Sequence, residues 1–383
     1  MHFQIVRGLG LAAIVAFGAA CSPAPSAGPT DPGGASIGPT ASSAGSPPDA
    51  SLGPSAGAST SPPACLQQLR VGLVAQPGSL TDNGFNQAAV AGLEAAKAAA
   101  PSCFRTDVVA SKNVTDATAD LNAYADSSYD VVIAVGQVLG DALGDVAATH
   151  SGARFIGIDA APGPTHDATW QVNGESLFFA EDQQGYLAGV LAALVSPGHD
   201  VGVVGGLALV PQVESSVEGF LHGAAATIPG MTVQFAYTTS FSDPAQGGAA
   251  ARAMIAKGAD VIFSTGSATG DGALLAACKA GVMAIGSNTD QALSLPKAAP
   301  CLVSSAMKNV VGALSGALLR LAGGSYSPGY HTDDATTGGI VMAPPHALAG
   351  AVSSTIQDRL AATLRGLADG SIRPNVVIDG KTP

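Results

Sequence analysis

"DVVIAVGQVLGDALGDVAATHSGARFIGID" (residues 130–159) contains the pattern from which we predict the fold. It begins with an apolar run at 130–135, continues through a helical pattern at 138–149 and ends with a second apolar run at 154–158. Short, continuously apolar strands separated by a helix are typical of βαβ units, in which helices cover both faces of a parallel sheet. The stretch therefore predicts an α/β fold.

The same alternation continues on both sides of this stretch. Two series of four strands are predicted, at 69–75, 105–110, 130–135, 154–158, and then at 200–206, 232–237, 260–265 and 282–287. The helical patterns between them lie at 83–100, 117–127, 138–149, 213–227, 245–257 and 272–280. A further strand and helix reach to about residue 322, and a last helix is predicted at 353–368. Two successive series indicate two similar lobes rather than one large sheet.

The first residues have the pattern of an export signal. "MHFQIVRGLGLAAIVAFGAAC" has Arg7 near its start, a short apolar stretch at 9–17 and small residues before Cys21. We predict a signal peptide at 1–20 and acylation of Cys21, as at a bacterial lipobox. The alternative is a plain secretory signal in which this cysteine is incidental. No other stretch of the sequence has 18 or more apolar residues, so attachment to a membrane would be through lipid alone.

Residues 22–63 consist almost entirely of Ser, Ala, Gly, Pro and Thr. Such a segment lacks the large apolar side chains that offset the entropy cost of ordering, so we predict a disordered tether. The predicted organisation is a lipidated N-terminus and linker at 21–64, lobe 1 at 65–172 plus about 300–330, and lobe 2 at 173–299 plus about 331–383.

Charge and cysteine usage argue against two kinds of site. The formal net charge of −12 leaves no basic excess for a nucleic-acid backbone, so nucleic-acid binding is not expected. The His residues are scattered, and no Cys/His spacing indicates a zinc site.

An exported chain permits disulfides, and we predict Cys65–Cys103 and Cys278–Cys301, with four buried free thiols as the alternative.

Polar residues and two phenylalanines follow the predicted strands. In open α/β sheets, ligands bind beyond the carboxyl ends of the strands. The candidate ligand-binding residues at these positions are Gln76, Phe85, Asn86, Gln137, Asp159, Phe241, Gly266, Asn288 and Lys308. Each position also has a structural explanation, as a helix cap, a core contact, a turn or a surface lysine.

Phe85 and Phe241 share one setting. Both lie in polar loops, "TDNGFNQ" and "TSFSDP", between a strand and a helix, and the two loops belong to different predicted lobes. Two facing aromatic rings suit the sandwiching of a flat ring, and such stacking contributes about 1–3 kcal/mol per base. Amide and carboxylate groups around such a clamp would read ring edges or sugar hydroxyls, and Lys308 would donate to hydroxyl or carbonyl oxygens.

The order of several segments resembles that of a known family. They are "TDNGFNQAAVAGLEAA" (81–96), "VVIAVGQVLGDALGDVA" (131–147), "FIGID" (155–159), "FFAEDQQGYLAGVLAAL" (178–194), "VGVVGG" (201–206), "VEGFLHGA" (217–224), "FSDPAQGGAAARAMIAKGADVIF" (241–263), "TGSATGDG" (265–272), "IGSNTDQ" (285–291) and "SSAMKNV" (304–310). Over about residues 66–345 the chain resembles the basic membrane protein family of bacterial substrate-binding lipoproteins, which includes purine nucleoside receptors of ABC importers. The resemblance implies a type I periplasmic-binding fold, in which two lobes, each a parallel sheet flanked by helices, are joined by a hinge.

The resemblance also assigns roles to individual residues. In nucleoside-binding members of the family two phenylalanines stack on the base, and the matching positions are Phe85 and Phe241. Ligand contacts are implied for Asn86, for Lys308 and for the glycine loop that begins at Gly266.

Two positions depart from the family pattern. Gln76 stands where the family carries an aspartate after the first strand, and Asn288 stands where it carries the aspartate that holds ribose hydroxyls. A carboxylate accepts hydrogen bonds only, whereas a carboxamide both accepts and donates. A pyrimidine, an oxidised purine or another flat polar solute is therefore an alternative to a purine nucleoside.

The resemblance implies solute capture rather than catalysis. We expect a monomeric, lipid-anchored protein on the outer face of the bacterial cell membrane that delivers a nucleoside-like solute to ABC permease and ATPase subunits. No cofactor, metal or catalytic residue is expected. The alternatives are a ligand-sensing lipoprotein that presents its closed form to a receptor partner, and a secreted nucleoside hydrolase. The hydrolase is disfavoured because no GxSxG, HExxH or His/Asp/Ser grouping lies at the strand ends.

Overall fold

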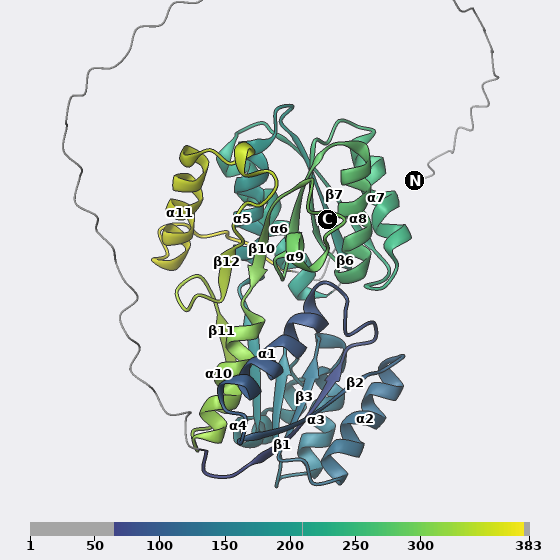
Figure 1. The fold of residues 1–383 in the computed structure, drawn as a ribbon, viewed down its shortest axis with the longest axis vertical. Coiled ribbons are helices and arrows are strands. Elements are labelled where there is room, and N and C mark those ends of the chain that lie inside the picture. The colour runs from purple at the N-terminus through teal and green to yellow at the C-terminus, as the bar shows by residue number, and fades with distance from the viewer. Residues whose placement is uncertain (1–64, 209, 379–383) are drawn as a thin grey trace, which may run out of the picture. The chain divides into compact units, whose positions relative to one another are not determined.

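The computed structural model describes residues 65–208 and 210–378. Within these residues the strands form two six-stranded sheets, and helices cover both faces of each sheet (Figure 1). The two sheets define lobe 1 and lobe 2. The predicted α/β architecture of two lobes is confirmed.

The sheet of lobe 1 has the strand order β11-β5-β4-β3-β1-β2. Its strands are β1 (Leu69–Ala75), β2 (Phe104–Ala110), β3 (Val131–Val135), β4 (Arg154–Ile158), β5 (Gly174–Phe179) and β11 (Gly329–Asp333). Neighbouring strands in this order pair in parallel. Because helices cover both faces of the sheet, the inner strand β3 is buried along its whole length, and this burial accounts for its continuously apolar sequence.

The sheet of lobe 2 repeats this pattern, in the order β12-β10-β9-β8-β6-β7. Its strands are β6 (Asp200–Leu207), β7 (Thr232–Thr238), β8 (Val261–Thr265), β9 (Met283–Ser287), β10 (Leu302–Lys308) and β12 (Ile340–Met342). β12 runs antiparallel to β10, and the other neighbouring strands are parallel.

Most helices pack against the sheet of their own lobe, whereas α10 packs on α1 and α11 packs on α5. Those of lobe 1 are α1 (Phe85–Ala99), α2 (Val114–Asp126), α3 (Gly140–Thr149), α4 (Asp167–Asn173) and α10 (Val310–Ala322). Those of lobe 2 are α5 (Glu181–Val195), α6 (Pro211–Thr227), α7 (Pro244–Ile255), α8 (Ser267–Ala280), α9 (Gln291–Ser294) and α11 (Ser354–Ala368). Short 3-10 turns occur at η1 (Gln137–Leu139), η2 (Pro164–His166) and η3 (Ala349–Ala351).

The predicted lobe boundaries differ from this arrangement at three strands. β5 was expected in lobe 2 and lies in the sheet of lobe 1, whereas β10 was expected in lobe 1 and lies in the sheet of lobe 2. β11, which spans the predicted boundary at residue 330, lies wholly in lobe 1. The predicted boundaries assign each of β5 and β10 to the same lobe as the helix that follows it. In the structure the chain leaves one lobe between β5 and α5, and again between β10 and α10, which packs on α1 of lobe 1.

In the described part of the chain, three segments connect the lobes: β5 to α5, β10 to α10, and β11 to β12. β11, β12 and α10 lie on one side of the view in Figure 1, and α2, α7 and α8 lie on the other. Hinged proteins absorb the backbone change of closure at such short connecting segments. The arrangement matches the predicted type I periplasmic-binding fold.

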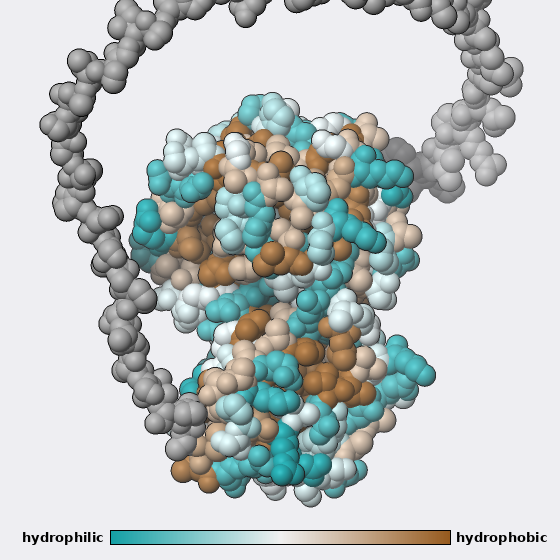
Figure 2. All heavy atoms as spheres, viewed as in Figure 1, coloured by the Kyte–Doolittle hydropathy of each residue, from teal (hydrophilic) through white to brown (hydrophobic). Residues whose placement is uncertain are grey.

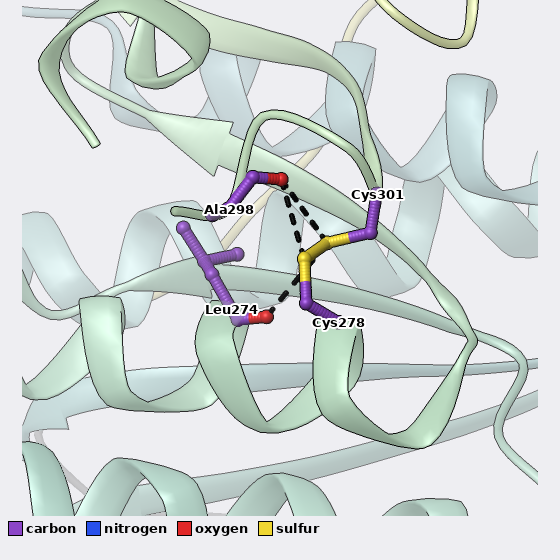
Figure 3. The surroundings of a disulfide bond; sticks show 4 residues. All are labelled: Leu274, Cys278, Ala298 and Cys301. Carbon is purple, nitrogen blue, oxygen red and sulfur yellow. Dashed lines mark hydrogen bonds between the residues drawn. A yellow bond between two sulfur atoms is a disulfide. The ribbon is translucent and has the colours of Figure 1, made fainter. Parts of the chain in front are cut away.

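Two disulfides are present, with the predicted pairing. Cys65–Cys103 joins the segment that precedes β1 to the residue before β2, with Cα atoms 5.6 Å apart. Cys278–Cys301 joins α8 to the start of β10, with Cα atoms 5.2 Å apart. The carbonyl oxygen of Ala298 lies 3.2 Å from each sulfur of this second disulfide (Figure 3). Both bonds link elements of a single lobe, so neither restrains movement between the lobes.

The predicted signal peptide at 1–20, the acylation site Cys21 and the linker up to residue 64 lie outside the described residues. Among the helices that are described, none is long and apolar enough to cross a membrane. On the face seen in Figure 2, hydrophilic residues are interspersed with smaller hydrophobic patches on both lobes.

Candidate functional site

A cavity lies at the carboxyl ends of the strands, with walls from both lobes. The volume of this cavity is about 60 Å³. The residues that line it are Gln76, Phe85, Gly136, Gln137, Val138, Asp159, Glu181, Val210, Gln212, Val213, Phe241, Thr265, Ser267, Asn288 and Lys308. The structure therefore brings together all the predicted ligand-binding residues except Asn86 and Gly266.

Asn86 and Gly266 lie just behind this lining. Asn86 is buried in the first turn of α1, and its Nδ2 donates to the backbone oxygens of Gln76 and Ser79, each at 3.2 Å. The side chain thus stabilises the loop between β1 and α1. Gly266 precedes α8, and its two chain neighbours line the cavity.

Asp82 organises the same loop. Its carboxylate accepts hydrogen bonds from the backbone nitrogens of Gly84 at 3.0 Å and of Asn86 and Gln87 at 3.1 Å. Burial raises the pKa of Asp82, and these backbone hydrogen bonds act in the opposite direction. Nitrogens in the first turn of a helix have no partner within the helix, so the carboxylate fixes the point at which α1 begins.

Phe85, the first residue of α1, belongs to both the cavity wall and the core. Its side chain is 6% exposed and packs in the hydrophobic core of lobe 1. The Nζ of Lys308 lies 4.6 Å from the centroid of the Phe85 ring and 5.5 Å from that of Phe179, which is the range of a cation–π contact. The ring of Phe85 is therefore held in the cavity wall by packing in the core.

Phe241 follows β7 and forms the corresponding wall in lobe 2. Its half-buried ring lies so close to Gly206 of β6 that a Cβ on the glycine would be 2.3 Å from Cε1 of the ring. A similar approach occurs after β3, where a Cβ on Gly136 would be 2.3 Å from Oε1 of Gln76. Gly136 also has a φ of 95°, which favours glycine. Both glycines make room for a side chain of the site.

Lys308 forms a buried charge cluster with two carboxylates. Its Nζ donates to Oδ2 of Asp159 and, at 3.2 Å, to Oε1 of Glu181. Asp159 follows β4, Glu181 begins α5 and Lys308 ends β10, so the last two residues flank connections between the lobes. Burial raises the pKa of Glu181 to about 8, the charge of Asp159 adds to this effect and Lys308 opposes it. Burial acts to lower the pKa of Lys308, but the two carboxylates outweigh it and raise that pKa.

The raised pKa of Glu181 predicts a pH dependence of stability. Because the folded pKa lies above the ordinary value of 4.5, the folded chain binds this proton more tightly than the unfolded chain does. The resulting stabilisation is complete below pH 4.5 and is lost as the pH rises through 8. Burial of Asp271 raises its pKa to about 7 and adds an effect of the same sign. We expect the melting temperature to fall less between pH 4.5 and pH 8 in Glu181→Gln than in the unmodified chain. Equal falls in the two proteins would mean that the folded chain does not hold this proton.

Three lining residues have left-handed backbone conformations. Asp159, Ser267 and Asn288 have φ values of 46°, 50° and 65°, and they lie just after β4, β8 and β9. For residues other than glycine such conformations cost about 1–3 kcal/mol each and cluster at ligand sites. These three conformations are consistent with a candidate ligand site at the strand ends around the cavity.

Two buried acceptors in the lining have no hydrogen-bond partner among the described residues. They are Oδ1 of Asp159 and Oε1 of Gln212. A buried acceptor without a partner costs about 1–3 kcal/mol, so a ligand that donates to these atoms would be favoured. Asn288 differs from these two residues, because its Oδ1 already accepts a hydrogen bond from Nε2 of Gln184 at 3.1 Å.

Sequence reasoning missed Glu181 and Gln212. Each is near the start of a helix, where a carboxylate or a residue after proline has an ordinary structural explanation. The available signal was the same as for the predicted residues, namely a polar side chain after a buried strand. Val138, Val210, Val213 and Thr265 also line the cavity, and nothing in their sequence context distinguishes them from core residues.

Comparisons with known proteins identify a family for this chain. A family model described as "ABC transporter substrate-binding protein PnrA-like" matches residues 69–365. A CD4+ T-cell-stimulating antigen of Listeria innocua is 30% identical over 207 residues, and the ABC transporter nucleoside-binding protein BmpA of Lactococcus lactis is 27% identical over 213 residues. Each match covers 53% of this chain, with 56% and 57% of the relatives, so the chain spans just over half the length of these curated relatives.

The fold is similar to that of solved structures. An ABC transporter solute-binding protein from Aeropyrum pernix superposes with a TM-score of 0.70 at 20% sequence identity. The superposition covers 80% of this chain and 92% of the other. At this level of identity the similarity concerns the fold.

Proposed function

The chain belongs to the family of PnrA-like substrate-binding proteins of ABC transporters, and we propose that it captures a solute outside the cytoplasm for an ABC importer. The observation that carries the proposal is the cavity at the strand ends, which has walls from both lobes. A solute bound there favours the closed arrangement of the lobes because it contacts both of them at once. Permease and ATPase subunits would be the partners of the monomeric binding protein.

The proposed solute is flat, neutral and similar to a nucleoside. Phe85 and Phe241 supply aromatic walls from the two lobes, and we propose that the solute stacks between them. Asp159 and Gln212 offer unpartnered acceptors to its donor groups. Among the lining residues that the structure describes, only Lys308 is basic, and two carboxylates already pair with it. An anionic solute would therefore lack a counter-charge, which disfavours nucleotides and carboxylates.

Entry of such a solute requires the lobes to separate. The cavity of about 60 Å³ is smaller than the roughly 300–1,000 Å³ of typical ligand pockets. Gln76 and Asn288 present carboxamides where the family carries aspartates, so we include pyrimidine nucleosides and oxidised purines in the proposed class. The nucleoside-binding relative of Lactococcus lactis supports the class as a whole.

A thermal-shift screen tests the proposal. Inosine, uridine and cytidine are compared with free bases, neutral sugars, amino acids and inosine monophosphate. A ligand present at 100 times its Kd stabilises the folded chain by about 2.7 kcal/mol, so at least one neutral nucleoside should raise the melting temperature while its phosphate does not. Stabilisation by a sugar or an amino acid, with none by nucleosides or bases, would contradict the proposal. Chromatography should recover the nucleoside intact, because no catalytic step is proposed.

We further propose that acylated Cys21 anchors the protein to the outer face of the cell membrane, with residues 22–64 as the tether. Cells that express the chain and are fed labelled palmitate should label it, and Cys21→Ser should remove the label. Export should persist in the variant. Labelling that survives this substitution would refute the anchor.

A further inference from the structure

Asn83 lies in the loop of lobe 1 between β1 and α1 and contacts lobe 2. Its φ of 55° places it in the left-handed region. The neighbouring Asp82 holds the loop through its hydrogen bonds to the first turn of α1, so the position of Asn83 is fixed relative to lobe 1. Asn83 does not line the cavity.

Three hydrogen bonds join Asn83 to lobe 2, and we call them the closure contact. Its Nδ2 donates to Oδ2 of Asp271 on α8 at 2.8 Å. Its backbone oxygen accepts from the hydroxyl groups of Thr289 and Ser294, each at 2.8 Å. The amide and the backbone oxygen of one residue thus both bond to the opposite lobe.

The partners in lobe 2 are themselves held in place. Oδ1 of Asp271 accepts from Nε2 of Gln291 at 2.8 Å, and Oε1 of Gln291 accepts from the backbone nitrogen of Ser287 at 2.8 Å. The hydroxyl groups of Thr289 and Ser294 are 3.0 Å apart. Both Asp271 and Gln291 are buried. Little side-chain order has to be gained when Asn83 docks, so a larger part of the interaction contributes to closure.

We propose that Asn83 is a positioning residue for closure of the lobes, and that the closure contact stabilises the closed arrangement without touching the solute. Its hydrogen bonds can form only when the two lobes approach, so they shift the equilibrium between open and closed forms. The affinity for any solute that binds the closed form rises with the population of that form. The effect on affinity rests on the proposed solute-binding function, whereas the effect on the lobe positions does not.

The test measures the distance between the lobes directly. Spin labels are placed by Ala119→Cys on α2 and Ala253→Cys on α7, which are exposed positions on the side away from β11 and β12 (Figure 1). Pulsed electron resonance is recorded without added solute. Asn83→Gly keeps the backbone oxygen and accommodates the positive φ, and it removes only the bond to Asp271. We expect its distance distribution to shift towards longer, open distances.

The chain offers a matched control. Asn375 is an exposed asparagine with a φ of 54° that does not line the cavity, so Asn375→Gly makes the same chemical change outside the closure contact. Thr289→Val is a second variant, which removes a hydroxyl donor of the closure contact at nearly constant volume. Both Asn83→Gly and Thr289→Val should lengthen the distances, and Asn375→Gly should not. Identical distributions in Asn83→Gly and Asn375→Gly would overturn the proposal.

Stopped-flow binding of inosine adds a kinetic measurement. We expect the dissociation rate to rise about tenfold in Asn83→Gly, with the association rate unchanged, because the open form admits the solute in both proteins. If inosine and the other nucleosides do not bind, the proposed solute class is wrong, and the distance measurement still decides the role of Asn83. An unchanged dissociation rate in a variant that binds inosine would contradict the inference.

Discussion

Lys308→Met is expected to lower the free energy of unfolding by about 3–5 kcal/mol, because removal of one partner leaves buried charges uncompensated. The ammonium group is the shared partner of Asp159 and Glu181, and all three side chains are less than a tenth exposed. Since the pKa of Glu181 is raised to about 8, that carboxyl is largely protonated at neutral pH, and most of the cost falls on the Asp159 carboxylate. Urea unfolding followed by circular dichroism measures the change.

Two further variants separate the charge cluster from a general effect of losing a lysine. Lys97 pairs with Glu94 on the exposed face of α1, so Lys97→Met should leave the unfolding curve nearly unchanged. Adding Asp159→Asn to Lys308→Met should restore part of the lost stability, because it removes the carboxylate that lost its partner. A loss in Lys308→Met no larger than that in Lys97→Met would show that the cluster does not stabilise the fold.

Phe241→Ala is expected to weaken nucleoside binding about 5- to 150-fold, which corresponds to about 1–3 kcal/mol of stacking. The ring is half-buried, so the variant should fold, and isothermal titration calorimetry with the nucleoside found in the screen measures the affinity. Phe235→Ala is the matched control, because Phe235 lies on the neighbouring β7, is 38% exposed and does not line the cavity. Equal affinities in the two variants would contradict stacking on Phe241.

Phe85→Ala is a less informative test of the same clamp. Phe85 is buried in the core of lobe 1, and truncation of a core phenylalanine costs about 3–5 kcal/mol. A loss of binding in this variant could reflect a loss of structure. The two phenylalanines look equivalent in the sequence. An effect on binding can be separated from an effect on folding more easily at Phe241 than at Phe85.

The sequence was sufficient to predict the two lobes and most of the cavity. The strands are continuously apolar because both faces of each sheet are covered, and the residues after parallel strands converge at one edge. Phe85, Phe241 and Lys308 could therefore be expected at strand ends, and the family resemblance assigned the two phenylalanines to stacking from opposite lobes. The Cys65–Cys103 pairing followed in the same way, since cysteines beside adjacent strands come close in space, and Cys278–Cys301 was the remaining pair.

Other features could not be predicted, for physical reasons. The lobe to which a strand belongs depends on packing between distant segments. No local sequence pattern in β5 or β10 indicates that the chain crosses to the other lobe after these strands. Asn86 looks like a ligand-reading amide, but whether an amide faces a ligand or a backbone carbonyl is decided by three-dimensional geometry. Glu181 has an ordinary explanation at a helix start and gains its importance only from burial beside Lys308.

The strand order of lobe 1 has a consequence for how the chain folds. β11 completes the sheet beside β5, yet it follows all of β6 to β10 in the sequence. Until that late strand arrives, β5 presents an unpaired edge, which is a template for wrong pairing and aggregation. Neither lobe can be obtained by cutting the chain once, and a segment that ends at Phe179 lacks both β11 and α10. The newly synthesised chain is therefore most prone to aggregation before its C-terminal third has been made. Lobe 1 reaches its complete fold only when segments from both the N-terminal and the C-terminal part of the chain are present.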